Sequence, residues 1–199
     1  MTTHLANIPV LILAAGGSTR MGVDKPLLRF RSGKRLLEDQ IERLTKAGLE
    51  EIFVVIGCHA NLIKSEFAGL NVKWFENRSW ELGSFSSLQT GIKNIPSLED
   101  GVLILPIDAA GISPTTIDDI VSNGIKTKKS AIPLFNKQRG HPVYLNKKIC
   151  MAILEAKPDG RLDLILEDEK ELLLLPTNDA NILQNINTMN EWDLFLSFR

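Results

Sequence analysis

Short apolar runs alternate with amphipathic segments along most of the chain. Several of the runs are continuously apolar, which is typical of parallel strands that are covered on both faces. The pattern predicts strands over residues 10–14, 51–56, 72–75, 102–105 and 130–134. After about residue 135 the alternation is less regular, and the runs at 143–145 and 172–175 predict strands that extend or cover the edge of the sheet.

The segments between these runs carry apolar residues three and four positions apart, which predicts helices with one buried face. Two such stripes are Leu37, Ile41 and Leu44, and Phe85, Leu88 and Ile92. Ser113 before Pro114 predicts a helix start, because a capping side chain precedes a proline at the first helical position. Residues 146–155, 161–168 and 189–198 also predict helices. The alternation indicates an α/β fold, a Rossmann-like three-layer sandwich around a mostly parallel sheet.

Composition and length fit one soluble globular domain over residues 1–199. The chain is 44% hydrophobic and 24% charged, and this length suffices for one sizeable core. Cys58 and Cys150 are far apart and form no Cys-x-x-Cys motif, so we expect neither a zinc ribbon nor a disulfide framework. Residues 1–15 lack a basic start and a long apolar stretch, so we expect no signal peptide, no membrane span and a cytoplasmic location.

Charge is balanced in total but not in position. The 23 Lys and Arg residues against 24 Asp and Glu residues argue against a nucleic-acid partner, whose binding domain is usually basic. Residues 20–35 nevertheless hold six basic residues and one acid, whereas residues 155–171 hold seven acids and three bases. The basic stretch therefore predicts a local site for a small anionic ligand of about the size of one nucleotide.

The loop after the first predicted strand carries the strongest chemical signal. In an open α/β sheet ligands bind at the carboxyl ends of strands, and small residues let backbone N–H groups surround an anion. Arg20 can grip two phosphate oxygens and Lys25 can act as a point charge, which a plain turn does not need. The loop is neither a P-loop nor a dinucleotide fingerprint. We expect nucleotide contacts from Leu13, Ala14, Ala15, Gly16, Gly17, Ser18, Arg20 and Lys25.

This loop, residues 13–26, resembles the signature of MobA-like NTP transferases, the molybdenum-cofactor cytidylyl- and guanylyltransferase type of nucleotidyltransferase. Further similarities follow in the order of the family. Residues 83–88 resemble its base-contacting segment, Asp108 its metal-binding aspartate, residues 140–142 its Gly-His-Pro turn and residues 185–188 its late metal motif. The resemblance covers nearly the whole chain.

The resemblance implies a nucleotide-diphospho-sugar transferase-like fold and a defined reaction. A nucleoside monophosphate would pass from a triphosphate to a small phosphorylated acceptor such as molybdopterin, with release of pyrophosphate and a requirement for Mg²⁺. It implies that the catalytic residues are Arg20, Lys25 and Asp108, that Asp108 and Asn187 hold the metal, and that Gly83, Ser84 and Ser87 contact the nucleotide. Residues 14–16 read Ala-Ala-Gly, as in the cytidylyl branch, which favours CTP over GTP. We expect a monomer or a weak homo-oligomer.

Taken without the resemblance, these residues have simpler interpretations. A loop aspartate such as Asp108 most often serves a turn or a helix cap. Asn187 is as compatible with a turn before a helix capped by Thr188 as with a metal ligand. Ser84 can simply cap a helix, and a structural turn explains His141 better than catalysis does. Trp74, Trp80 and Trp192 are expected in the core or at an interface rather than against a ligand.

The chain also departs from the family pattern. The family usually has Pro two positions after the metal aspartate, where this chain has Ala110, and its late motif continues Pro-Glu-Asp, where this chain has residues 189–191 reading Met-Asn-Glu. The acceptor region around residues 160–161 matches only loosely. Two alternatives therefore stay open: a non-catalytic nucleotide-binding or regulatory protein, whose metal loops are displaced, and a dinucleotide-dependent oxidoreductase.

Overall fold

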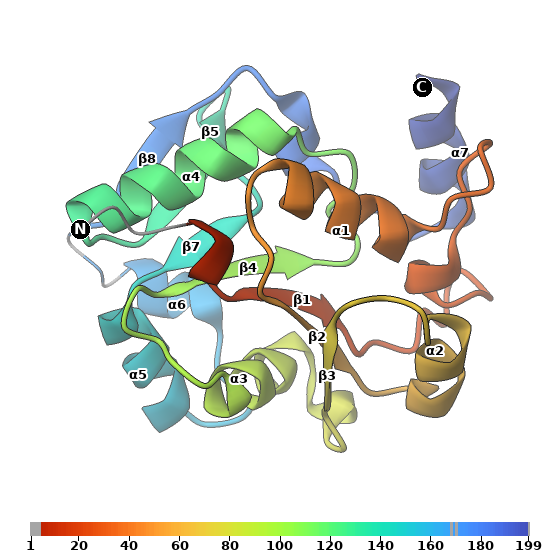
Figure 1. Cartoon of the computed structure of the whole chain (residues 1–199), viewed down its shortest axis with the longest axis horizontal. Coiled ribbons are helices and arrows are strands. Elements are labelled where there is room, and N and C mark those ends of the chain that lie inside the picture. Colours follow the sequence, from red (N-terminus) through yellow and green to blue (C-terminus); the bar gives the residue numbers. More distant parts are fainter. Residues whose placement is uncertain (1–4, 168, 170, 199) are drawn as a thin grey trace.

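The computed structural model describes residues 5–167, 169 and 171–198, and these residues form an eight-stranded sheet with helices on both faces (Figure 1). The sheet runs in the order β3-β2-β1-β4-β7-β5, with β6 and β8 also paired to β5. Its strands are β1 (Val10–Ala14), β2 (Ile52–Ile56), β3 (Lys73–Glu76), β4 (Val102–Pro106), β5 (Ala131–Phe135), β6 (Gln138–Arg139), β7 (Val143–Leu145) and β8 (Leu173–Pro176). The predicted α/β fold with a mostly parallel sheet is confirmed.

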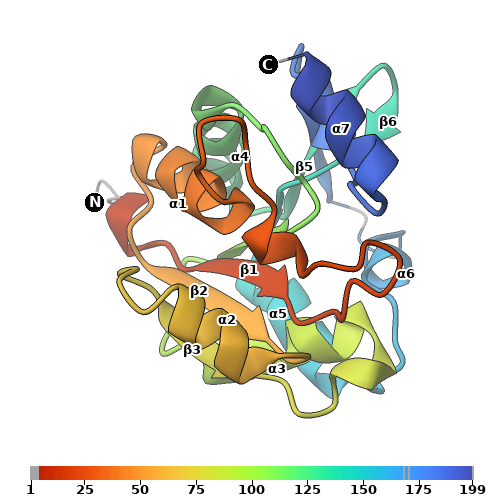
Figure 2. The ribbon, with the colours of Figure 1, turned by 90° about the vertical axis from the view of Figure 1, so that its right-hand side faces the viewer.

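Two apolar cores separate the sheet from its helices. One core includes side chains of α1, α4 and α7, and the other includes side chains of α3, α5 and α6. Figure 1 shows α1 and α4 on one side of the sheet and α3 and α5 on the other, and Figure 2 shows the same arrangement after a turn of 90°. The helices are α1 (Leu36–Lys46), α2 (Ala60–Glu66), α3 (Ser84–Asn94), α4 (Pro114–Thr127), α5 (Lys147–Glu155), α6 (Leu162–Glu167) and α7 (Met189–Ser197). Short 3-10 helices are η1 (Leu5–Asn7), η2 (Lys25–Leu27), η3 (Trp80–Leu82) and η4 (Ala180–Leu183).

Most predicted elements lie within one residue of the observed ones. All five residues of β2 are buried, as are four of the five in β1 and in β4, because each strand is covered on both faces. The predicted start of α4 is confirmed: the Ser113 Oγ accepts a hydrogen bond from the Thr116 N–H at 3.1 Å, and Pro114 is the first helical residue. The predicted end of α6 at Asp168 lies outside the described residues.

One predicted strand lies in a different place. We expected residues 143–145 to extend or cover the edge of the sheet, but β7 lies inside it, antiparallel to both β4 and β5. All three of its residues are buried, because strands flank it on both sides and helices cover it. Strand β8 pairs in parallel with β5 and does extend the sheet. The two residues of β6 are exposed and carry no apolar pattern, so this strand is not among the predicted elements. Helix α2 is missing from them too, although Ala60, Ile63 and Phe67 lie three and four positions apart and pack in one core.

The order of the strands determines where a ligand can bind. Strands β1, β2 and β4 are parallel neighbours, with Leu13 in register with Pro106 and with Val55. The loops that follow β1 and β4 therefore leave the sheet at the same edge. None of the described helices is both long enough and apolar enough to cross a membrane.

Candidate functional site

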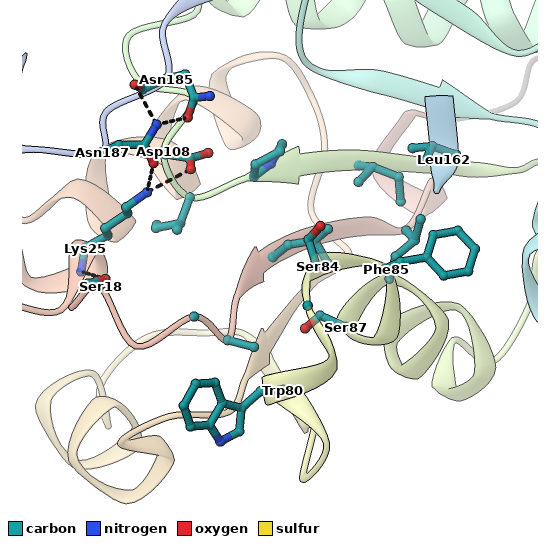
Figure 3. Close-up of a pocket in the computed structure, with 18 of the residues that line it drawn as sticks. Ser18, Lys25, Trp80, Ser84, Phe85, Ser87, Asp108, Leu162, Asn185 and Asn187 are labelled. Atoms are coloured by element: carbon teal, nitrogen blue, oxygen red, sulfur yellow. Dashed lines mark hydrogen bonds and ion pairs between the residues drawn. The ribbon is translucent and has the colours of Figure 1, made fainter. Parts of the chain in front are cut away.

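A cavity of about 650 Å³ opens at the carboxyl ends of β1 and β4 (Figure 3). Its wall comes from the loop after β1, the start of α3, the end of β4, the start of α6 and the segment before α7. Most of the predicted ligand-binding residues line it: Leu13, Ala15, Gly16, Ser18, Arg20, Lys25, Gly83, Ser84, Ser87, Asp108 and Asn187. Two predicted residues do not: Ala14 packs into the core, and Gly17 faces Cys58 and Trp80.

Lys25 joins the two residues that the resemblance assigned to a metal. Its Nζ donates to Asp108 Oδ2 at 2.8 Å and to Asn187 Oδ1 at 2.8 Å, although these residues lie 83 and 162 positions away in the chain. The side chains of Lys25 and Asp108 are 13% and 25% exposed, so the ion pair is largely screened from water. Folding thus brings an ammonium, a carboxylate and an amide oxygen together at one end of the cavity (Figure 3).

The altered late motif keeps Asn187 in place. The Asn187 Nδ2 donates to the Oδ1 of Asn185 at 2.9 Å, so the Asn187 Oδ1 is turned toward Lys25. Glu191 accepts the N–H groups of Asn187 and Thr188 at 2.7 and 2.8 Å, and these bonds, led by that from Asn187, hold the pKa of Glu191 below its usual value. Thr188 caps α7 as predicted. Glu191 therefore fastens the motif without the family's proline.

The loop that carries Asp108 is also held in place. The Ile186 N–H donates to the Asp108 backbone oxygen at 3.0 Å, which joins this loop to the late motif. Ala109 and Ala110 are buried, with exposures of 1% and 0%. With alanine instead of the usual proline at position 110, Asp108 lies in contact with Lys25.

The glycine-rich loop is braced from both sides. The Ser18 Oγ accepts the backbone N–H of Lys25 at 3.2 Å, and the Ala15 oxygen accepts the N–H of Cys58 at 3.0 Å. Asp24, which is 8% exposed, lies with both carboxylate oxygens 3.0 Å from the Nδ1 of His59. These contacts fix the loop backbone around the cavity, while the side chain of Arg20 stays exposed where the loop borders it.

A buried residue behind the cavity wall, in contact with the lining residue Ser87, carries no signal in the sequence. Asn77 is 3% exposed, and its Nδ2 donates to the Oγ of Ser86 at 2.9 Å and of Ser87 at 3.0 Å. Its Oδ1 accepts the N–H of Ser79 at 2.9 Å. Asn77 thus ties the end of β3 to the first turn of α3. A lone asparagine after a strand has no spacing signal that could have revealed this role.

The tryptophans and His141 differ from one another in their surroundings. Trp192 is in the core as predicted, 5.1 Å from the ring of Phe30. Trp80 packs against the core that includes α3, as predicted, and it also lines the cavity beside the glycine-rich loop (Figure 3). His141 also lines the cavity, and its backbone N–H donates to the Ile182 oxygen at 2.9 Å. Burial lowers the pKa of His141 against the opposing charge of Asp108, so its imidazole is neutral at pH 7.

The donor set at Lys25 suits a hard cation. The Asp108 carboxylate and the Asn187 amide oxygen approach one atom, the Lys25 Nζ, from two sides. The described residues contain no group of three or more His, Cys, Asp or Glu side chains that could hold a metal. Such an oxygen pair fits a cation of the Mg²⁺ type, which takes its other ligands from phosphate and water, rather than a tetrahedral zinc site.

Comparison with known proteins identifies the family. Residues 10–172 match the model of the MobA-like NTP transferase domain. The bifunctional protein GlmU of Picosynechococcus is 31% identical over 144 residues, 72% of this chain, but this chain spans only about a third of that protein, 32%. Nicotine blue oxidoreductase of Paenarthrobacter nicotinovorans is 23% identical over 198 residues, 95% of this chain and 96% of that protein.

Solved structures have the same fold. Rv0371c of Mycobacterium tuberculosis superposes with a TM-score of 0.80 at 19% identity, covering 96% of this chain and 98% of that one. A second structure of Rv0371c is a complex with manganese, with a TM-score of 0.77 at 18% identity and the same coverage. The family match spans the glycine-rich loop, the start of α3 and Asp108 but ends before Asn187, whose Oδ1 accepts a hydrogen bond from the Lys25 Nζ in the site. The chain belongs to the MobA-like NTP transferase domain family, a family of nucleotidyltransferases.

Proposed function

We propose that this protein transfers a nucleoside monophosphate from a triphosphate to a small phosphorylated acceptor and releases pyrophosphate. The observation that carries the proposal is the contact of Lys25 with both Asp108 and Asn187, on the wall of a cavity that the glycine-rich loop also lines. This arrangement places positive charge, backbone N–H groups and hard oxygen donors around one space. A triphosphate and its counter-ion need all three.

The reaction asks the protein mainly for positioning and charge neutralisation. An acceptor phosphate oxygen attacks the α-phosphorus in line, and the bond from that phosphorus to the oxygen bridging to the β-phosphate breaks. Arg20, Lys25 and the N–H groups of Ala15, Gly16 and Ser18 hold the triphosphate and stabilise the charge that develops on the leaving pyrophosphate. The acceptor phosphate is already anionic, so no side chain has to act as a base.

Asp108 and Asn187 are the residues that would hold a divalent cation. When bound, such a cation neutralises and polarises the phosphate oxygens. The manganese complex of Rv0371c supports a divalent metal, and we propose Mg²⁺ as the ion that this protein uses. For these two oxygen atoms to hold a cation, the Lys25 ammonium would have to release them and pair with the triphosphate oxygens instead.

Ser87 is proposed to contact the base. Its Oγ accepts the Nδ2–H of Asn77 and donates to no described residue, so the hydroxyl proton is available to an acceptor atom of a ligand in the cavity. Ser86 differs, because its hydroxyl donates to the Gly83 oxygen at 2.8 Å. A cytosine ring offers the acceptor atoms O2 and N3 to such a donor. Other bases offer acceptor atoms too, so the preference for CTP rests on the Ala-Ala-Gly of residues 14–16, and molybdopterin is the first acceptor to test.

Replacing Ser87 with alanine is expected to raise the KM for the preferred triphosphate about 5- to 10-fold and to change kcat little. One hydrogen bond to the base contributes about 1 kcal/mol to binding in the ground state and the transition state alike. Steady-state pyrophosphate release measures the effect. Ser86→Ala is the matched control, because its hydroxyl proton is used inside the protein. Equal KM values for Ser87→Ala and the unchanged protein would contradict the assignment of Ser87.

Thermal unfolding with a panel of ligands tests the proposed function. We expect CTP with Mg²⁺ to raise the midpoint most among CTP, GTP, ATP, UTP and NAD, each with and without Mg²⁺. A ligand at about 100 times its Kd adds about 2.7 kcal/mol, or roughly 5–10 °C for a chain of this size. Pyrophosphate release with the stabilising triphosphate and an acceptor panel completes the test. A triphosphate that stabilises the protein without any pyrophosphate release would favour the regulatory alternative.

A second candidate function rests on one comparison. Nicotine blue oxidoreductase aligns over nearly the full length of both chains, so an oxidoreductase activity is a proposal to test on the same cavity. That activity has no use for a lysine placed between a carboxylate and an amide oxygen. Stabilisation by NAD, with no effect of any triphosphate and Mg²⁺, would favour it over nucleotidyl transfer.

A further inference from the structure

Gln40 on α1 contacts the backbone on both sides of Asp108. Its Nε2 lies 3.1 Å from the Pro106 oxygen, 3.2 Å from the Ile107 oxygen and 3.0 Å from the Ala109 oxygen. The side chain reaches these atoms across 66 to 69 positions of the chain, and the residue is 2% exposed. One buried amide group therefore serves as donor to the whole turn that leads from β4 through Asp108.

The surroundings of this amide show which of its two ends matters. The Gln40 Oε1 is buried and has no hydrogen-bond partner among the described residues. A buried oxygen without a partner is unfavourable, and an apolar side chain of similar size would avoid it. The donor end alone thus accounts for a glutamine here: without it, carbonyl groups next to Asp108 would lose their partner.

Other contacts connect this amide to both oxygen donors of the site. The Asp108 backbone oxygen accepts the N–H of Ile186, the residue before Asn187. Arg43, one turn further along α1, donates to the Ile112 oxygen at 3.3 Å and extends the contact with the same loop. Helix α1 thereby fixes the loop of Asp108, and that loop in turn is bonded to the segment of Asn187.

We propose that Gln40 is a positioning residue that sets the affinity of the Asp108 and Asn187 site for a divalent cation. The inference rests on the proposed function only in taking these two residues as the metal ligands. Groups that orient metal ligands through hydrogen bonds typically change metal affinity 10- to 100-fold when they are removed. Without the Gln40 donor we expect the turn to relax, so that the Asp108 carboxylate and the Asn187 oxygen no longer lie close enough to bind the same ion.

The test is binding of Mn²⁺ alone to nucleotide-free protein, followed by the electron paramagnetic resonance signal of the free ion. Gln40→Met is expected to raise the Kd for Mn²⁺ on the order of 10-fold relative to the unchanged protein. Gln40→Asn withdraws the amide by one methylene group and should shift the Kd in the same direction, which provides a second variant if the first folds poorly. High Mg²⁺ concentrations should restore pyrophosphate release in both.

Gln89→Met is the matched control. The Gln89 Nε2 also donates to two backbone oxygens, those of Ile153 and Ala156, both at 2.8 Å, but these lie at the end of α5. Its Mn²⁺ affinity should stay within about twofold of the unchanged protein, even if its unfolding midpoint falls as far as that of Gln40→Met. Equal Mn²⁺ affinities in the Gln40 variants and the unchanged protein would overturn the inference.

Asp108→Ala separates this inference from the proposed function. If the unchanged protein binds Mn²⁺ no better than Asp108→Ala, the metal site and the role of Gln40 both fail. If Mn²⁺ binds at Asp108 but no triphosphate yields pyrophosphate, the proposed nucleotidyl transfer is wrong. The change in the Kd for Mn²⁺ caused by Gln40→Met then still tests the role of Gln40.

Discussion

Asp108→Ala is expected to lower pyrophosphate release about 10³-fold, because it removes the carboxylate that lines the cavity in contact with Lys25. The variant also leaves the Lys25 ammonium, which now bonds to Asp108 at 2.8 Å, with the neutral Asn187 oxygen alone. Two effects therefore act together: the cation site loses its negative ligand, and Lys25 loses the ion pair that holds it before the ligands bind. Asp108→Asn should be nearly as inactive, since it keeps the shape of the side chain but not its charge.

Single-turnover pyrophosphate release at saturating triphosphate and Mg²⁺ measures this effect. Asp118→Ala serves as the control, because Asp118 lies on α4 and accepts a hydrogen bond from Ser122 outside the cavity. Its activity should be unchanged. Asp108→Ala protein that folds normally and retains more than about a tenth of the activity would contradict the role of Asp108 in the metal site.

The bounds of the strands could be predicted closely because each strand is a continuous apolar run in the sequence. Strands β1, β2 and β4 are buried on both faces, so nearly every position is apolar and the run itself marks the element. An apolar run does not indicate which other strands pair with it in the sheet. Strand β7 lies between β4 and β5 because of antiparallel pairing with both, and its three residues carry no sign of that position.

The candidate site also combines a part that a local motif predicts with a part that depends on residues far apart in the chain. The glycine-rich loop with Lys25 is one continuous motif, and its chemistry can be inferred before any fold is known. Lys25 and Asn187 are 162 positions apart in the chain, and only folding brings them into contact. The sequence around Asn187 is therefore about equally compatible with a metal ligand and with a turn. The roles of Gln40 and Asn77 cannot be predicted from the sequence for another reason. Their amide groups donate to backbone or hydroxyl oxygens, and such contacts impose no period or spacing on the sequence.

Lys25→Met is expected to change two measurements in opposite directions. Pyrophosphate release should fall about 10²- to 10³-fold, because the triphosphate and the leaving pyrophosphate lose a positive charge that is held next to them. Mn²⁺ binding to nucleotide-free protein should instead tighten on the order of 10-fold, because the ammonium competes with a cation for the Asp108 and Asn187 oxygens and methionine does not. Lys25→Arg should restore little activity, since a planar guanidinium cannot occupy the same small space.

The opposite signs distinguish a specific role of Lys25 from damage to the fold. A variant that is merely unstable would lose activity and Mn²⁺ affinity together. Loss of a competing ammonium instead lowers pyrophosphate release and raises the affinity for Mn²⁺. Lys46→Met is the control, because Lys46 is exposed on α1 and pairs with Glu42 away from the cavity. Weaker Mn²⁺ binding by a folded Lys25→Met protein would show that the ammonium helps to build the cation site rather than to compete for it.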